Sequence, residues 1–225
     1  VIVSDKSLSI TEPGKTVIPG RFFIDIIRKV SSKVVTLTLI EDKILSIKAD
    51  RAEYKLHVMD YIDYPTIDFV CLENPVSIEA PVLKNIIRQT VFATSQSEKK
   101  PILTGVNLNL HDNKLTAIAT DSYRLSKVIV PIDGDYNDFN ITITNKSLDE
   151  ISKSIDTYED CLDLYFSSKS LLFKFKNVLF QTRLLDGTYP DTSRLIPPSF
   201  PINIKFNKEE LLEAVERVSL LSPRD

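Results

Sequence analysis

One short stretch of the chain combines the side-chain types that general acid–base catalysis uses. It holds Asp121, Tyr123 and Arg124, and Asp186 is a further carboxylate that could stand beside them. Catalysis by such a group requires a base or nucleophile that is poised by its neighbours. The stretch therefore predicts a candidate acid–base cluster, which has to be weighed against the rest of the sequence.

The rest of the sequence gives catalysis little support. His57 lies in an alternating strand pattern and His111 in a turn, so neither histidine extends the cluster. The five glycines form no phosphate-binding loop, and neither a metal-ligand spacing nor a nucleophile elbow occurs. Cys71 and Cys161 lack a partner at metal or redox spacing and are interpreted as free thiols in a reducing cytoplasm. We expect no enzymatic activity, no metal and no cofactor.

The composition is that of an ordinary globular protein, with 225 residues, 43% of them hydrophobic, and a net charge of −3. Because DNA-binding domains are usually basic, any DNA-facing surface must be a local patch. No run of about 18 apolar residues suggests a membrane span. The start shows no secretory signal and no initiator Met, and it resembles the middle of a strand. We therefore expect a fragment of a cytoplasmic protein.

A repeat of about 60 residues organises the chain, and each copy places a short strand before an amphipathic helix. The strands are predicted over residues 15–18, 76–78, 141–144 and 202–206, and the helices over residues 21–30, 81–91, 146–155 and 208–220. The first two helices share one apolar stripe, in which Phe22, Phe23, Ile26, Ile27 and Val30 recur as Val82, Leu83, Ile86, Ile87 and Val91. Such a stripe is typical of a helix that is buried against a sheet.

Three strand patterns follow each of the first three helices. They cover residues 34–40, 44–48 and 54–59, then 105–110, 114–120 and 124–130, then 162–166, 171–175 and 178–185. Their period-two alternation indicates antiparallel strands with one buried face, and the short turns at 41–43 and 111–113 indicate hairpins. The unit is βαβββ and the fold class is α+β. One unit leaves a single-faced sheet, so two should pack as one domain.

Four motifs give the chain a family resemblance. They are PGRFFIDII (19–27), KPILTGV (100–106), ATDSYRLS (119–126) and LLDGTYPD (184–191). In order and separation they resemble the bacterial beta sliding clamp, the DNA polymerase III beta subunit, with the greatest similarity to Firmicute versions. The resemblance implies a DNA clamp fold of repeated βαβββ units, with antiparallel sheets outside and helices on the inner face.

The resemblance also implies how the chain is divided and what it binds. Residues 1–70 would be the second half of domain one, residues 71–199 a complete domain two, and residues 200–225 the first strand and helix of domain three. Pro-rich segments at 63–65 and 197–201 support these borders. A full-length homodimer ring would encircle double-stranded DNA without reading its sequence. DNA polymerase and the clamp loader would dock on it through short linear peptides.

The polar faces of the helices are the candidate DNA-facing surface. Lys84 and Arg88 lie four residues apart, and two like charges at that spacing cost about 0.2–0.5 kcal/mol unless an anion is near. A solvated basic face is the alternative, and Asp25, Asp149 and Glu150 dilute the charge. The resemblance favours DNA contact by Arg21, Arg28, Lys29, Lys84, Arg88 and Lys146, and by the loop residues Lys99 and Lys100.

A partner cleft is implied at the second and fourth motifs. By motif position its wall would consist of Leu103, Thr120, Ser122, Tyr123, Arg124, Leu125, Pro190, Arg194 and Leu195. The leucines and the proline offer an apolar pocket, and the arginines supply hydrogen bonds at its rim. Tyr123 stands where the family commonly has His. The alternative is that residues 120–124 are only a tight turn and Leu195 only core.

A non-catalytic scaffold that pairs with other chains through its exposed sheet edges is the rival function. Such a scaffold has no need for basic helix faces that share one surface. Arg28, Lys84 and Arg88 therefore separate the two hypotheses, because a clamp requires them to face a common inner side.

Overall fold

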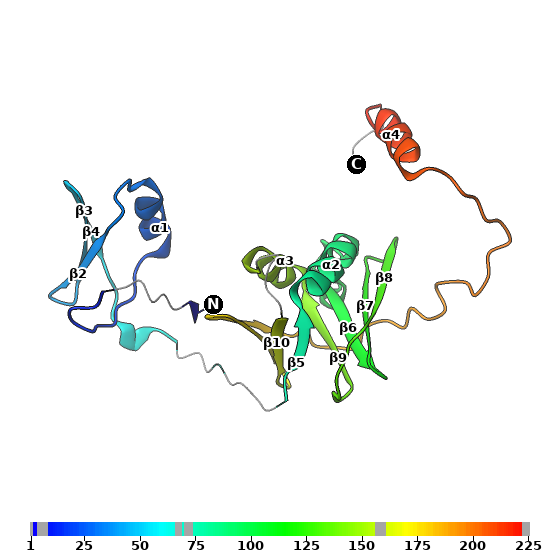
Figure 1. Ribbon diagram of the computed structural model, residues 1–225, viewed down its shortest axis with the longest axis horizontal. Helices are drawn as coiled ribbons and strands as arrows, with labels where there is room; N and C mark the ends of the chain where they lie inside the picture. Colours follow the sequence, from blue (N-terminus) through cyan, green and yellow to red (C-terminus); the bar gives the residue numbers. More distant parts are fainter. Residues whose placement is uncertain (1, 4–8, 66–68, 70–73, 156–160, 222–225) are drawn as a thin grey trace. The chain divides into compact units, whose positions relative to one another are not determined.

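The computed structural model describes residues 2–3, 9–65, 69, 74–155 and 161–221 (Figure 1). The chain divides into two compact units, residues 1–187 and residues 188–225. Cys71 lies outside the described residues, while Cys161 is an exposed free thiol. Within the described part of the chain, no helix has the length and apolar character needed to cross a lipid bilayer.

The four predicted helices are confirmed to within one residue at each end. They are α1 (Gly20–Lys29), α2 (Ala80–Thr90), α3 (Asn145–Ser154) and α4 (Lys208–Ser219). Local chemistry accounts for where two of them begin. The Thr144 hydroxyl accepts the Ser147 N–H at the start of α3, and the Asn207 side chain accepts the Glu209 and Glu210 N–H groups at the start of α4.

Residues 9–65 contain one helix and one three-stranded antiparallel sheet, in the order β2-β3-β4. The strands are β2 (Thr36–Ile40), β3 (Ile44–Ala49) and β4 (Ala52–His57), and a short 3-10 helix, η1 (Tyr61–Asp63), follows. The strand predicted over residues 15–18 is wrong, because only Val17 forms a bridge, to Met59. None of the α1 residues is fully buried. In the stripe that was predicted to be covered, Phe23 and Ile26 are half-buried, while Phe22 and Ile27 are exposed.

Residues 74–187 contain the two paired units. The strands are β5 (Val76–Glu79), β6 (Gly105–His111), β7 (Lys114–Thr120), β8 (Leu125–Pro131), β9 (Phe139–Thr144), β10 (Cys161–Phe166), β11 (Ser170–Phe175) and β12 (Val178–Arg183). One sheet has the order β8-β7-β6-β9 and the other β1-β12-β11-β10-β5, where β1 is Ile2–Val3. All recorded pairings are antiparallel, as predicted. Short 3-10 helices, η2 (Val91–Ala93) and η3 (Pro101–Thr104), connect α2 to β6.

The first strand of each paired unit joins the sheet of the other unit. β5 precedes α2 but pairs with β10, and β9 precedes α3 but pairs with β6. Each unit therefore completes its neighbour's sheet and satisfies the backbone groups of that sheet's edge. This exchange of strands explains why the two βαβββ units pack together as one compact structure.

The predicted hairpins are also confirmed. Asp112 and Asn113 connect β6 to β7 and both have positive φ, 49° and 56°. Positive φ at both central residues is the signature of a type I′ turn, which matches the twist of the flanking strands. Glu41 and Asp42 repeat this conformation between β2 and β3, with φ of 49° and 53°.

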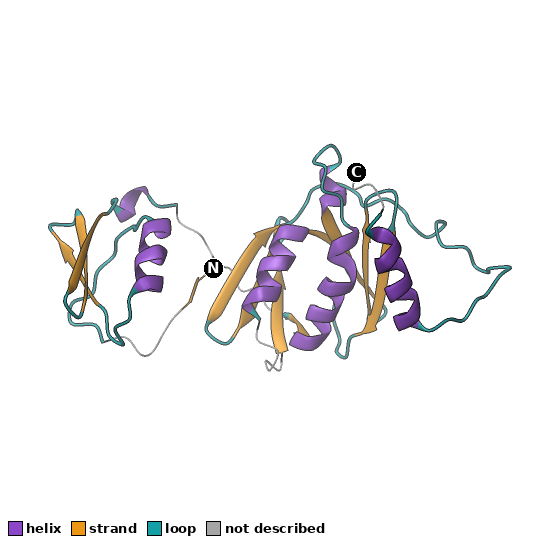
Figure 2. Cartoon of the chain, turned by 90° about the horizontal axis from the view of Figure 1, so that it is seen from above, coloured by secondary structure: helices purple, strands orange, loops and turns teal. Residues whose placement is uncertain are grey.

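One core fills the space between the two sheets and the two helices of residues 74–187. Helices α2 and α3 lie side by side on it (Figure 2). Leu83, Ile86 and Ile87 of α2 enter this core together with Leu148 and Ile151 of α3. Their polar faces are thereby left pointing away from the core.

The second unit, residues 188–225, contributes α4 and an extended segment before it. The strand predicted over residues 202–206 is wrong, because these residues form no strand. A strand must pair to satisfy its N–H and C=O groups, and no other strand occurs among the described residues of this unit. The alternating pattern therefore has no partner there.

Candidate functional site

Three cations of α2 and α3, Lys84, Arg88 and Lys146, form no ion pair among the described residues. Lys84 is half-buried, and Arg88 and Lys146 are exposed. Arg88 Nη2 donates to Asn85 Oδ1 at 2.9 Å, and within the described residues none of the three cations pairs with a carboxylate. Their charge is therefore available to an external anion.

A polar contact brings the end of α2 to the beginning of α3. Asn145 Nδ2, in the first turn of α3, donates to Thr94 Oγ1 at 3.0 Å, just beyond α2 and η2. The last turn of α2 carries Arg88, and the first turn of α3 carries Lys146. The partial positive charge of a helix N-terminus adds to that of Lys146. This end of the helix pair can attract phosphate groups.

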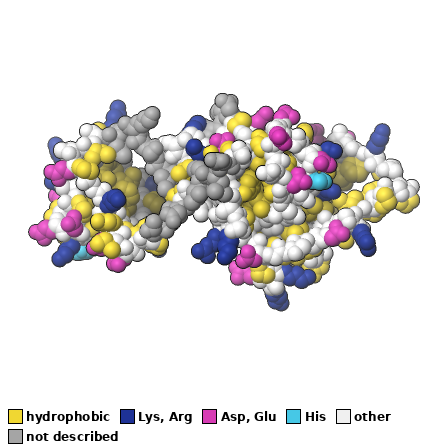
Figure 3. Space-filling view, turned by 90° about the horizontal axis from the view of Figure 1, so that it is seen from below, with side chains coloured by type: hydrophobic (Ala, Val, Ile, Leu, Met, Phe, Trp, Pro, Cys, Tyr) yellow, Lys and Arg dark blue, Asp and Glu magenta, His cyan; other side chains and the backbone are white. Residues whose placement is uncertain are grey.

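The rest of the α3 polar face is nearly neutral, as its sequence indicates. Lys153 Nζ lies 2.8 Å from Glu150 Oε1, and this hydrogen bond raises the pKa of Lys153. Asp149 and Glu150 are exposed. The basic surface of the helix pair is therefore thin. Figure 3 shows the molecule from the side opposite to that of Figure 2, and basic and acidic side chains are interspersed there too.

The other predicted DNA-facing residues lie outside this helix pair. Arg21, Arg28 and Lys29 are exposed on α1, and Lys99 and Lys100 are exposed in the loop before η3. Arg28 and Lys29 occupy the last turn of α1, where cations are favourable for the helix itself. That these residues share one surface with Lys84 and Arg88 stays a prediction.

The predicted cleft residues between Thr120 and Leu125 form one tight turn. Thr120 Oγ1 donates to the Arg124 carbonyl at 2.7 Å and accepts the Ser122 N–H at 3.1 Å. Ser122 has a φ of 81°, in the region that side chains rarely adopt. The turn lifts Tyr123 into solvent, where 98% of its surface is exposed.

Asp121 fixes this turn from within. Its Oδ1 accepts the backbone N–H groups of Tyr123 at 2.9 Å and Arg124 at 3.0 Å. These hydrogen bonds hold the pKa of Asp121 below its ordinary value, and the bond from the Arg124 N–H has the largest effect. Because the carboxylate is ionised and already bonded, it suits a structural role better than that of a catalytic base.

The apolar wall of the predicted cleft is less open than its residue types suggest. Leu103 is only 3% exposed and belongs to the interior, and Leu125 is half-buried. Phe92, which sequence reasoning missed, is 58% exposed and lies 5.9 Å from the Arg124 guanidinium. The signal in the sequence is weak, because an aromatic residue after a helix usually indicates core.

Pro190, Arg194 and Leu195 belong to the second unit and are exposed there. A short turn holds them, in which Asp191 Oδ1 accepts the Ser193 N–H at 2.9 Å. Hydrogen bonds from Ser193 lower the pKa of Asp191. Since Leu195 is 63% exposed, the interpretation of this residue as core is wrong.

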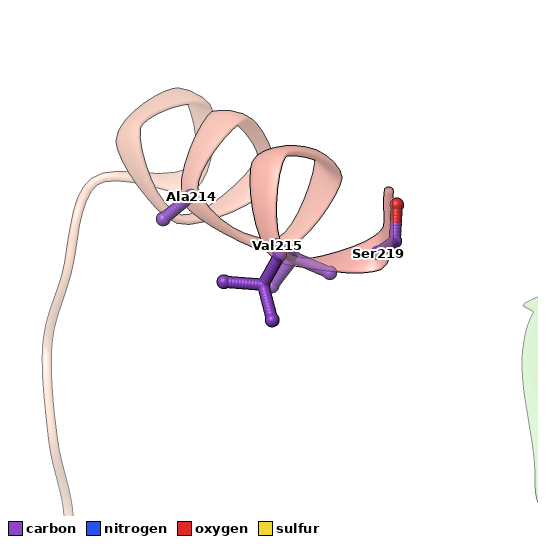
Figure 4. Close-up of a pocket in the computed structure, with 4 residues that line it drawn as sticks. Ala214, Val215 and Ser219 are labelled. Carbon is purple, nitrogen blue, oxygen red and sulfur yellow. The ribbon is translucent and has the colours of Figure 1, made fainter. Parts of the chain in front are cut away.

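Two hollows do not coincide with predicted sites. Ala214, Val215, Val218 and Ser219 line a shallow one on the apolar face of α4 (Figure 4). The other is lined by residues 15–18 together with Tyr61, Tyr64 and Pro65, and Lys15 Nζ lies 6.0 Å from the centre of the Tyr61 ring. Within the described residues, no group of three or more potential metal ligands is close enough to hold an ion.

Two protein-family models match the chain. The DNA polymerase III beta subunit central domain matches residues 77–191, more than half of the chain, and the N-terminal domain of the same subunit matches residues 1–68. The beta sliding clamp of Staphylococcus epidermidis is 38% identical over 218 residues, which are 97% of this chain and 58% of that protein.

Solved structures agree with these matches. The DNA polymerase sliding clamp of Bacillus subtilis superposes with a TM-score of 0.91 at 39% identity, over 96% of this chain and 57% of that one. The Helicobacter pylori beta clamp bound to a DNA ligase peptide superposes with a TM-score of 0.84 at 25% identity, over 95% of this chain and 60% of that one.

Proposed function

Because this chain belongs to the DNA polymerase III beta subunit family, the bacterial beta sliding clamps, we propose that it is part of a processivity clamp that encircles double-stranded DNA and tethers the replicative polymerase. Its α+β architecture is the DNA clamp fold of these relatives. The chain spans 58% of the length of the Staphylococcus relative. Closure of a homodimer ring is therefore proposed for the full-length form, acting in the cytoplasm.

We propose the following division of the chain. Residues 1–70 form the second half of clamp domain one, residues 71–199 form domain two, and residues 200–225 begin domain three. The exchange of β5 and β9 between two βαβββ units supports a complete domain two, since neither sheet is whole without both units. The single unit in residues 9–65, with its uncovered helix, supports a half domain.

The observation that carries the DNA proposal is the pair α2 and α3, whose apolar faces share one core. Lys84, Arg88 and Lys146, which form no ion pair among the described residues, lie on their other faces. Contacts to phosphates hold no sequence information and weaken as salt rises. A thin basic lining therefore favours DNA without fixing one register, and the clamp can slide. Retention on DNA then depends on ring closure and not on tight binding.

The partner proposal rests on the turn at residues 120–125 and on the Helicobacter clamp, which binds a DNA ligase peptide. Arg124 supplies hydrogen-bond donors at the rim, and the side chains near it supply apolar surface. We propose that Pro190, Arg194 and Leu195 complete this wall. Short linear peptides of DNA polymerase and of the clamp loader are the proposed ligands, and no catalysis is proposed.

Binding to a linear duplex tests the DNA proposal. We expect weak binding of the wild-type chain, with an affinity that falls steeply as salt rises. The double variant K84E/R88E should bind more weakly, and its slope of log affinity against log salt should be smaller by about two. The matched control is K127E/K174E, which changes net charge equally at exposed strand positions. Fluorescence anisotropy over a salt series measures the affinity and its salt dependence for each protein.

Two results would contradict the DNA proposal. One is equal loss in K84E/R88E and in K127E/K174E, because binding would then depend only on net charge. The other is salt-resistant or sequence-specific binding to a short duplex. A scaffold that pairs through sheet edges would show no DNA binding at all, and nuclease and ATPase assays should be negative for either function.

A further inference from the structure

Arg124 is held by two side chains although 56% of its own side chain is exposed. Its Nε donates to Asp121 Oδ2 at 3.0 Å, which makes the pair both a hydrogen bond and an ion pair. Its guanidinium carbon lies 5.9 Å from the centre of the Phe92 ring, within the range of Arg–aromatic attraction. In the described part of the chain, its two Nη groups make no hydrogen bond. They are available to a ligand.

Asp121 connects the backbone of the turn to this guanidinium. One carboxylate oxygen accepts the N–H groups of Tyr123 and Arg124, and the other accepts Arg124 Nε. The Asp121 side chain is only 19% exposed, so solvent competes little for these bonds. An arginine fixed in this way loses its rotamer freedom on folding instead of on binding, which favours affinity.

The ion pair also decides which acceptor suits Arg124. A guanidinium paired with a carboxylate still presents two Nη donors, but its net charge is largely cancelled. Such donors match neutral carbonyl oxygens better than a free carboxylate or a phosphate. Phe92, which is 58% exposed, and Tyr123, which is 98% exposed, add apolar surface for a side chain of the ligand.

Resting on the proposed partner site, we propose that Asp121 is a positioning residue and that Phe92 extends the apolar floor of the site. Together they hold Arg124 so that its Nη groups donate to the neutral backbone carbonyls of a bound peptide. Asp121 acts through Arg124 and is not itself in contact with the peptide. The site therefore selects an extended apolar peptide and not an acidic one.

NMR titration of the isotope-labelled 225-residue chain tests this inference, with the Helicobacter DNA ligase peptide as the probe. The variant D121N keeps an oxygen for the backbone N–H groups but loses the acceptor for Arg124 Nε. We expect faster solvent exchange of the Arg124 Nε–H, and a Kd about two- to tenfold higher than that of the wild-type chain. Wild-type Kd should change little between about 0.05 and about 0.3 M salt.

The control variant is D133N, which makes the same chemical change at an exposed loop position. Among the described residues Asp133 has no hydrogen-bond or ion-pair partner, so D133N should behave like the wild-type chain. F92L is the second variant. It leaves the Asp121 bonds in place, so it tests the position of Arg124 even if D121N disturbs the turn. F92L should also weaken binding and speed exchange at Arg124 Nε–H.

The outcomes separate the two proposals. Absence of any peptide-induced shift at Arg124 and Leu125 in the wild-type chain would overturn the partner site and the inference with it. Wild-type binding with D121N and F92L both unchanged would overturn the positioning role alone. Tighter, strongly salt-dependent binding in D121N would show that Arg124 recognises an anion and would overturn the preference for neutral carbonyls.

Discussion

Helices α1 and α2 carry almost the same apolar stripe, yet only α2 buries it. Ile87 of α2 is 3% exposed, while Ile27, its counterpart in α1, is 36% exposed. Phe22 of α1 is 63% exposed. Hydrophobic side chains are also open to view in the part at the left of Figure 3, which holds residues 9–65. Similar local sequences thus lead to similar helices, but burial depends on the presence of a second unit.

The physical reason is the number of surfaces that each region offers. In residues 74–187, two sheets and two helices enclose one core, and each unit lends a strand to the other. In residues 9–65, one three-stranded sheet faces one helix, and the core cluster includes none of these residues. A single-faced sheet and one helix leave much apolar area in contact with water.

Truncating equivalent residues of the two helices should give the largest difference in stability between the two regions. Ile87→Ala leaves a cavity in the core and should lower the free energy of unfolding by about 2–5 kcal/mol. Ile27→Ala removes the same atoms from a partly exposed site and should cost less than about 1 kcal/mol. Urea unfolding combined with residue-resolved hydrogen exchange measures each change within its own region. Equal losses would mean that α1 is covered in solution.

Two glycines give the next contrast. A Cβ at Gly105 would lie 2.5 Å from the Ile143 carbonyl oxygen and 2.7 Å from Leu185 Cδ1, so Gly105→Ala should cost about 1–3 kcal/mol through overpacking. A Cβ at Gly20 would meet nothing within 4 Å, so Gly20→Ala should stabilise α1 by up to about 1 kcal/mol. Thermal unfolding checks whether the two substitutions change the stability in opposite directions. A neutral Gly105→Ala would contradict the tight contact between β6 and β9.

The smallest expected effect concerns His111, at the end of β6 in the hairpin β6–β7. The corresponding hairpin β2–β3 has no histidine. His111 Nδ1 lies 2.5 Å from Asp138 Oδ2, and this hydrogen bond, followed by the charges of Asp112 and Asp138, raises the pKa of His111. The stability that the His111–Asp138 hydrogen bond contributes to the folded protein is therefore fully present below the ordinary pKa of histidine. It is lost as pH rises through the higher folded-state pKa.

The variant D138N should remove this pH dependence. The difference in stability between the wild-type chain and D138N should be present near pH 5.5 and shrink towards about pH 9. Unfolding of both proteins across this pH range measures the difference, and NMR titration of His111 locates its pKa. A difference that stays constant with pH would rule out the His111–Asp138 bond as its source.

Much of the fold could be predicted because its signals are local. The four helices and the hairpin at Asp112 and Asn113 follow from periodicity and turn chemistry within a few residues. The strands predicted over residues 15–18 and 202–206 failed because a strand exists only with a partner, and the pattern of one segment does not contain that partner.

The candidate sites divide in the same way. The turn from Thr120 to Arg124 was visible as a motif, and its hydrogen bonds are within five residues of one another. The contact of Arg124 with Phe92 spans more than thirty positions. It depends on how β7 and β8, which flank the turn of Arg124, pack against η2 and α2. No pattern in either segment indicates it.

The sequence by itself determined the helices, the hairpins, the βαβββ repeat and the family resemblance, because each depends on residues that are neighbours along the chain or on motifs in a set order. The tertiary structure decided that β5 and β9 change places between units, that α2 is buried while α1 is open, and that Asp121 and Phe92 hold Arg124. These features require surfaces from distant segments to meet, and only packing determines which surfaces are available.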